Sequence, residues 1–139
     1  MKTTGVLRRI AVVNFDYTDF ANGVFTPVLI LPNGSQILGG GLTIVTPSNA
    51  AGTDTLSFGI NGTPARNLAA TDAKTAATTA LTALTSLTGE TLGITRAVSA
   101  GAGTAGKGYL YVEYLVPFAY DFLVGDLPNP ADLNGSHYP

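Results

Sequence analysis

The side chains that could perform chemistry are few in this sequence and lie far apart along it. Cysteine is absent, and the single histidine, His137, is followed by only two residues. A nucleophile–histidine pair requires an imidazole held rigidly beside the nucleophile. A terminal segment rich in proline and asparagine does not offer that support, so the sequence favours a solvated tail residue at His137 over a catalytic base.

A glycine-rich run, GAGTAGKG at residues 101–108, comes closest to a binding motif. It fits G-x-G-x-x-G, and it misses the phosphate-binding G-x-x-x-x-G-K-[ST] at Gly108, where a hydroxyl would ligate magnesium. Both phosphate motifs open a helix, whose N-terminal amides and dipole hold the anion. The residues from Tyr109 onward are strand formers instead, so the sequence favours a flexible hairpin loop over a nucleotide site.

Asp16 and Asp19, in the stretch FDYTDF, could place two carboxylates near one cation. Calcium takes six or more oxygen ligands, and no further acidic residues cluster nearby in the sequence. The pattern therefore favours a solvated loop between strands, and we expect neither a metal ion nor a cofactor.

Glu113 is the charged residue within the aromatic stretch YLYVEYLV. A charge in such a place ordinarily pairs across the sheet, and the candidate partners are Arg8, Arg9 and Arg96. A catalytic carboxyl would need a second acid placed to work with it, and none is evident. We therefore do not expect an enzyme.

Tyr109, Tyr111 and Tyr114 lie in that same stretch, the strongest strand candidate by propensity. With a period of two, Tyr109 and Tyr111 share one face of the strand and Tyr114 lies on the other. Strand tyrosines are most often half-buried, with the hydroxyl at the rim. A protein interface and a sugar-stacking surface are the alternatives.

The composition restricts the partners of the chain. Charged residues make up 12% and hydrophobic residues 45%, whereas about 25% charged residues is usual for soluble domains. The surface is therefore either coated with threonine hydroxyls or covered by copies of the chain or by a partner, and we favour the second. The net charge of −2 argues against nucleic acid.

The hydropathy pattern argues against a membrane protein. No apolar run approaches the roughly 20 residues that span a bilayer. The first residues do not read as a signal peptide. We therefore expect synthesis in the cytoplasm and no membrane partner.

Apolar alternation and turn residues predict about seven strands, at residues 6–17, 24–31, 35–46, 54–60, 91–98, 109–116 and 119–124. Pro27 indicates an edge or a bulge, and the glycines at 39–41 indicate a bulge or a sharp bend. Pro117 separates the last two strands. The fold class is mainly β, an antiparallel, jelly-roll-like β-sandwich.

Residues 66–87 are ambiguous. Alanines and leucines recur there at helical spacing, with Thr71 or Asp72 as a possible N-cap, whereas the many threonines oppose a helix. We expect one short helix or an irregular crossover near 68–87. Residues 1–125 are predicted to form one domain and residues 126–139 an extended C-terminal tail.

Residues 28–116 resemble the small structural proteins of tailed-bacteriophage heads, namely head decoration (cement) proteins and head-fibre bases. The shared pattern consists of strand ends and turns, here Leu31-Pro32, 39–45, 53–56, 61–64 and 112–114. The resemblance implies a β-sandwich that assembles as a homotrimer on the capsid exterior and bridges neighbouring major capsid subunits. It includes no catalytic signature.

The expected function is thus that of a virion structural protein that stabilises a phage capsid. For self-association we expect Tyr109, Tyr111, Tyr114 and Leu115 to carry the contact. For the contact with the major capsid protein we expect Thr3, Thr4, Leu127 and Tyr138. The alternative function is a receptor- or carbohydrate-binding module of a phage fibre.

Overall fold

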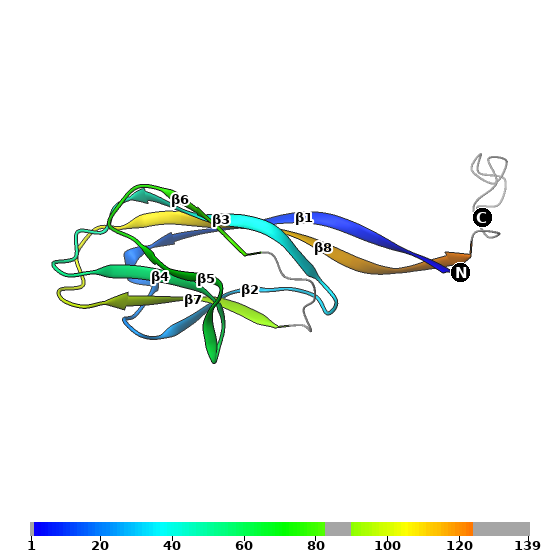
Figure 1. The fold of residues 1–139 in the computed structure, drawn as a ribbon, viewed down its shortest axis with the longest axis horizontal. Helices are drawn as coiled ribbons and strands as arrows, with labels where there is room; N and C mark the ends of the chain where they lie inside the picture. The colour runs from blue at the N-terminus through cyan, green and yellow to red at the C-terminus, as the bar shows by residue number, and fades with distance from the viewer. Residues whose placement is uncertain (1, 83–89, 124–139) are drawn as a thin grey trace.

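The computed structural model describes residues 2–82 and 90–123, of which 2–6 and 117–123 are described by their backbone alone. Two β-sheets pack face to face (Figure 1). The strands in this part of the chain are β1 (Lys2–Asp16), β2 (Phe25–Ile30), β3 (Gln36–Thr46), β4 (Asp54–Ile60), β5 (Thr63–Asp72), β6 (Thr78–Ala80), β7 (Thr91–Val98) and β8 (Lys107–Leu123). A 3₁₀ turn, η1 (Tyr17–Asp19), follows β1.

The strand orders are β1-β8-β3-β6 in one sheet and β2-β7-β4-β5 in the other, and neighbouring strands are antiparallel. The connections β1–β2, β3–β4, β5–β6 and β7–β8 all pass from one sheet to the other at the same end, which we call the crossover end. This arrangement agrees with the antiparallel, jelly-roll-like sandwich that the sequence predicts.

The core lies between the sheets and follows the period of two. Buried side chains come from alternate positions of the central strands, for example Leu110 and Val112 of β8 and Leu56 and Phe58 of β4. In β4 the inward side chains of Asp54, Leu56 and Phe58 are buried as predicted. Ser57 and Gly59 on the other face are buried as well and Ile60 is half-buried, so burial does not alternate over the whole of 54–60. Several large apolar side chains point outward all the same, with Ile30 72% exposed.

Both predicted irregularities are confirmed. β2 is an edge strand, and its register against β7 shifts between Pro27 and Leu29. The register of β3 against β8 shifts between Ile37 and Gly39. Gly40 has a φ of 144°, and a β-carbon there would overlap the carbonyl oxygen of Tyr111. Only glycine fits this approach of two backbones.

Of the two alternatives expected near 68–87, a short helix or an irregular crossover, the helix is wrong for the residues described. Residues 63–72 form β5, and 78–80 form the short β6, so the strand count rises to eight in the described part. Thr71 and Asp72 end a strand and cap no helix; the Asp72 carboxylate instead accepts hydrogen bonds from the N–H of Lys74 and the hydroxyl of Thr75. Threonine-rich sequence and pairing with β4 outweigh the alanine spacing. Residues 83–87 lie outside the described residues.

The last strand is also longer than predicted. β8 continues through Pro117 to Leu123, and β1 already begins at Lys2, where the prediction placed the start at residue 6. Proline is tolerated because β3 begins at Gln36, opposite Leu115, so one side of β8 has no strand neighbour beyond that point. Beyond the sandwich, residues 2–6 of β1 pair with 117–123 of β8 as a two-stranded extension, which we call the ribbon (Figure 1).

We expect Gly40→Ala to lower the free energy of unfolding by about 2 kcal/mol or more, because alanine is strained at positive φ and its methyl group meets backbone. Gly39→Ala is the matched control, since the space around Gly39 is open. Urea unfolding followed by tyrosine fluorescence measures both. Equal stability of the two variants would contradict the bulge geometry.

Candidate functional site

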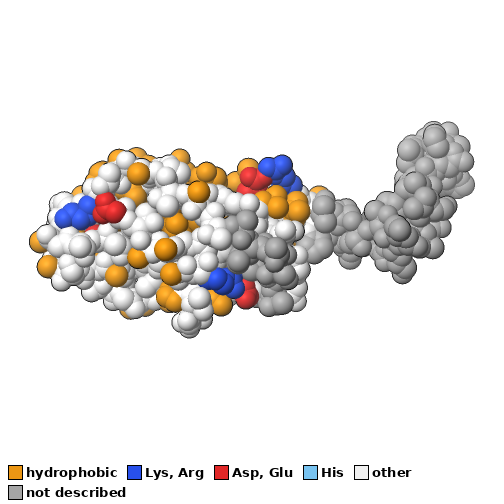
Figure 2. All heavy atoms as spheres, viewed as in Figure 1, with side chains coloured by type: hydrophobic (Ala, Val, Ile, Leu, Met, Phe, Trp, Pro, Cys, Tyr) orange, Lys and Arg blue, Asp and Glu red, His pale blue; other side chains and the backbone are white. Residues whose placement is uncertain are grey.

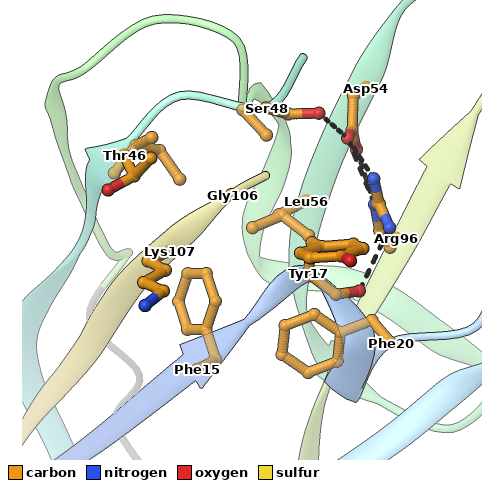
Figure 3. A pocket seen from close by; sticks show the side chains of 12 residues that line it. Phe15, Tyr17, Phe20, Thr46, Ser48, Asp54, Leu56, Arg96, Gly106 and Lys107 are labelled. Carbon is orange, nitrogen blue, oxygen red and sulfur yellow. Dashed lines mark hydrogen bonds and ion pairs between the residues drawn. The ribbon is translucent and has the colours of Figure 1, made fainter. Parts of the chain in front are cut away.

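Asp54 and Arg96 form a buried ion pair at the crossover end (Figure 3). Their exposed fractions are 1% and 4%. Arg96 Nε donates to Asp54 Oδ1 at 2.9 Å, and Arg96 Nη2 donates to Oδ2 at 2.5 Å. The hydroxyl of Ser48 donates to the same Oδ2 at 2.5 Å. The pairing is thus bidentate, the strongest form of an arginine–carboxylate contact.

The Arg96 guanidinium also holds backbone outside its own sheet. Its Nη1 donates to the carbonyl of Tyr17 at 3.1 Å, and its Nη2 donates to the carbonyl of Ala102 at 2.8 Å. Tyr17 begins η1, and Ala102 lies in the connection from β7 to β8. Arg96 therefore ties β4, the β1–β2 connection and the β7–β8 connection to β7.

These contacts also favour the charged forms of Asp54 and Arg96. Burial alone would raise the pKa of Asp54, but hydrogen bonds from Arg96 and Ser48, with the positive charges of Arg96 and Lys74, outweigh burial and hold that pKa below its ordinary value. The hydrogen bond to Asp54 raises the pKa of Arg96. The neighbouring cavity, of about 20 Å³, has room for roughly one water molecule. The pair can stabilise the fold but has no room for a substrate.

The glycine-rich connection at 101–108 does not form the hairpin that we predicted, because β7 and β8 belong to different sheets. Asn49 fixes it: its Oδ1 accepts hydrogen bonds from the N–H groups of Thr104, at 2.7 Å, and Ala105, at 3.0 Å. These amides are the donors that a phosphate would need, and they are occupied. The run opens into β8 and not into a helix, as the sequence indicates.

The carboxylates of Asp16 and Asp19 accept hydrogen bonds from backbone N–H groups and form a capping box at η1. The Asp16 N–H donates to Asp19 Oδ2 at 2.7 Å, and Asp16 Oδ1 accepts from the Thr18 N–H at 3.4 Å. Within residues 2–82 and 90–123, no three acidic or histidine side chains gather in a way that could hold a metal ion. In the same residues no helix is long and apolar enough to cross a membrane.

Glu113 pairs with Arg8, one of the three partners predicted for it. Arg96 pairs with Asp54 instead, a contact that sequence reasoning missed. A signal was present, since Asp54 and Arg96 each occupy the apolar face of a predicted strand. Opposite charges in the inward phase of two strands indicate a buried pair.

The outward face of the β1-β8-β3-β6 sheet carries the second candidate site. β1 and β8 are in register here, so Ile10 lies beside Glu113 and Val12 beside Tyr111. Ile10 is 65% exposed and Val12 58%. The rings of Tyr109 and Tyr111 have centroids 6.4 Å apart, and that of Tyr111 lies against Gly41. We call these residues the outer-face patch: Ile10, Val12, Tyr109, Tyr111 and Leu115.

The residues predicted for self-association divide between the two faces. Tyr109, Tyr111 and Leu115 belong to the outer-face patch, whereas Tyr114 packs against the core. Figure 2 shows apolar side chains spread over the visible surface, with charged atoms gathered in a few groups of mixed sign. The outer-face patch is apolar and has the Arg8–Glu113 pair beside it. An apolar patch with charged neighbours is suited to contact with another protein.

The residues predicted for the capsid contact are less fully described. Thr3 and Thr4 lie in the ribbon, where they pair with Phe122 and Asp121 of β8. Leu127, Tyr138 and also His137 fall outside the described residues.

We expect Asp54→Asn to lower the free energy of unfolding by about 3–5 kcal/mol, because it leaves the Arg96 charge buried and without its counter-ion. The matched control is Glu113→Gln. It breaks the pair with Arg8, whose side chain is 69% exposed, so it should lower that free energy by about 1 kcal/mol or less. Urea denaturation measures both, and equal losses would contradict a structural role for the buried pair.

The same pair predicts a pH dependence. The pKa of Asp54 is lowered by folding from an ordinary value of 3.8, so its contribution to stability is complete above that value. The contribution is lost as the pH falls through the lower pKa of the folded state. The stability gap between the wild type and Asp54→Asn should therefore be constant near neutral pH and shrink in acid. A gap that widens in acid would contradict this sign.

No protein-family model matches the sequence, and no curated protein matches it. Solved structures share its fold. A chain of the acid-stable capsid of Helicobacter pylori bacteriophage KHP30 is 22% identical with a TM-score of 0.64, and the match covers 88% of this chain and 98% of that one. A chain of the cyanophage Pam1 capsid asymmetric unit is 25% identical with a TM-score of 0.60, covering 82% and 86%. A chain of the Ralstonia phage GP4 capsid is 20% identical with a TM-score of 0.55, covering 85% and 88%. Over most of its length, this chain is thus similar in fold to components of three bacteriophage capsids.

Proposed function

We propose that this chain is a virion structural protein that decorates the exterior of a phage capsid and stabilises it. The observation that carries the proposal is the fold that it shares with chains of three phage capsids. Fold alone does not determine function, so the surface of this chain has to support the same role. Its outer-face patch does so, because it presents apolar side chains where a lone soluble domain would present charges.

The size of the matching chains supports an accessory role in the shell. The match covers 98%, 86% and 88% of those three chains, so each is close in length to this one. The fold is therefore a complete small chain in those capsids, and not a domain inserted in a much larger subunit. A small, separate chain suits attachment to a shell built by other subunits.

Self-association would use the outer-face patch, and the resemblance to decoration proteins favours a homotrimer. Joining copies through this sheet face would remove Ile10 and Val12 from water, at about 25 cal/mol for each Å² of apolar surface. A trimer attached to the exterior would contact several major capsid subunits at once. Because it binds only the assembled shell, it would stabilise that shell by mass action.

The ribbon is the second element suited to the shell contact. A two-stranded ribbon is marginally stable in water by itself, and this one projects beyond the sandwich (Figure 1). Thr3 and Thr4 lie on it. We infer that the ribbon rests on the capsid, together with the residues around Leu127 and Tyr138.

The alternative, a carbohydrate-binding module of a fibre, has weaker support. Sugar rings stack on flat, exposed aromatic faces. The planes of Tyr109 and Tyr111 are tilted by 41° to each other, and Tyr111 lies against Gly41. The pair therefore does not form one flat surface, which favours a protein contact.

Cryo-electron microscopy of purified particles of the source virus tests the proposal directly. We expect density for this fold on the outside of the shell, across boundaries between major capsid subunits. Particles whose shell lacks such density would overturn it.

We expect Val12→Lys to dissociate the self-associated protein, because the substitution places a charge beside Tyr111 within the apolar contact. Ile30→Lys is the matched control: Ile30 is also apolar and 72% exposed, but it belongs to β2 in the other sheet. Light scattering coupled to gel filtration, at micromolar concentration, should give a smaller mass for the first variant only. A wild-type protein that is monomeric under these conditions would argue against self-association.

A further inference from the structure

The edge strands of the two sheets differ in how well they are protected against the addition of a further strand. β2 carries Pro27 and a register shift, β5 carries Pro64 and two register shifts against β4, and β6 has only three residues. Each of these features hinders the addition of a further strand. β1 has 15 residues and no proline, and its one register shift, between Thr4 and Val6, leaves residues 6–16 regular. Among the described strands, the outer edge of β1 is therefore the one left unprotected.

The register shows which peptide groups of β1 point outward. The Tyr17 N–H donates to the Gly106 carbonyl at 2.8 Å, which continues the register that pairs Asp16 with Lys107. In an antiparallel ladder, alternate residues turn both their N–H and C=O groups to the same neighbour. Odd-numbered residues therefore face β8, and the even-numbered ones face the open edge: Arg8, Ile10, Val12 and Asn14.

Hydrogen bonds on the β6 side of the same sheet independently identify which residues of β1 face the open edge. The Gly40 carbonyl and the Ile44 N–H bond toward the β6 side of β3, so Gly40 faces away from β8. Its partner Val112 therefore faces β1, where it pairs with Ala11. Two independent sets of hydrogen bonds thus leave the even-numbered residues of β1 with unpaired backbone groups along the edge.

A groove lies next to this edge. It has a volume of about 330 Å³ and is lined from both sheets, by residues that include Val13 and Phe15 of β1, Val28 of β2, and Phe20. Asn14 and Thr26 also line it. Side chains on the inner face of an added strand would point toward this groove, and those on its outer face would lie beside Ile10 and Val12.

The charge of the edge indicates the chemistry of the partner. The chain has a net charge of −2, yet the middle of β1 carries two adjacent arginines, Arg8 and Arg9, whereas Asp16 and Asp19 lie at the groove end. Arg8 stays 69% exposed although it pairs with Glu113. An added segment would complement this strand if its acidic residues lay beside Arg8 and Arg9 and its apolar residue lay at the groove.

Two other occupants fit less well. The residues after Leu123 include Pro128 and Pro130, and proline cannot donate to a ladder. A second copy would have only its own β1 to offer, because its other edges are protected. Pairing β1 with β1 produces a twofold axis, which a trimer does not contain.

We propose that the outer edge of β1 takes up an extended acidic segment of the capsid shell protein as an added strand, with an apolar side chain of that segment in the groove. Recognition would be by strand addition, in which backbone hydrogen bonds give affinity and the groove gives specificity. This inference rests on the proposed function, since it takes the shell as the source of the segment.

Asn14→Pro tests the edge. It removes one outward N–H and leaves every N–H that faces β8, whereas Asn14→Ala is the matched control because it keeps the N–H. The probe is source particles from which this protein has been removed, to which recombinant protein is added back. We expect Asn14→Pro to bind on the order of tenfold more weakly than the wild type, and Asn14→Ala to bind like the wild type.

Thr26→Trp tests the groove without changing the backbone of β1, so it also serves if the proline variant fails to fold. We expect the indole to fill the groove and weaken rebinding, and the control Thr26→Val to leave it unchanged. If the wild type rebinds and both Asn14→Pro and Thr26→Trp rebind equally well, the edge is not the contact and only this inference fails.

Two further outcomes are distinct from that one. A wild-type protein that neither occurs on the particles nor rebinds to them would overturn the proposed function itself. A change in the oligomeric mass of Asn14→Pro in light scattering would show that a second copy occupies the edge, and it would overturn the choice of the shell as partner.

Discussion

The bidentate pair of Asp54 and Arg96 is the constraint on which the crossover end depends. A two-sheet sandwich whose connections pass repeatedly between the sheets needs those connections held in place. Arg96 holds the carbonyls of Tyr17 and Ala102 while its charge is balanced by Asp54. The Lys74 ammonium fastens the remaining connections by donating to two carbonyls of the β3–β4 segment. A permanently charged donor with several N–H groups in a fixed plane can join that many segments at once.

The end of the molecule opposite the crossover end has a different architecture. β1 and β8 leave the sandwich together and continue as a ribbon without a third strand (Figure 1). The same β1 carries the unprotected edge, the exposed Ile10 and Val12, and one wall of the groove. β1 therefore combines a core residue, Phe15, with exposed features that the folded monomer does not use.

The sequence could predict what short-range patterns decide. The burial of Leu56 and Phe58, the bulge at the glycines and the edge position of Pro27 all follow from local rules. The strand at 63–72 could not be predicted in this way, because its alanines fit a helix as well and pairing with β4 decides the outcome. Pro117 interrupts a strand only if both sides of that strand are paired, and this depends on where β3 begins. The inward phase of Asp54 and Arg96 could have indicated a buried pair, but their contact joins strands 42 residues apart in sequence, and only the sheet order brings them together.

The positions of the few charged residues explain why one sheet face of this chain is suited to contact with another protein. Asp54 and Arg96 are buried as a pair, and two further ion pairs, Arg66–Glu90 and Arg8–Glu113, lie nearer the surface. Asp16, Asp19 and Asp72 cap turns through hydrogen bonds to backbone N–H groups. Little net charge is left to keep the outward face of the β1-β8-β3-β6 sheet apart from other proteins. Because that face also presents Ile10, Val12 and two tyrosines, its association with another protein would cost little desolvation of charge and would bury apolar surface.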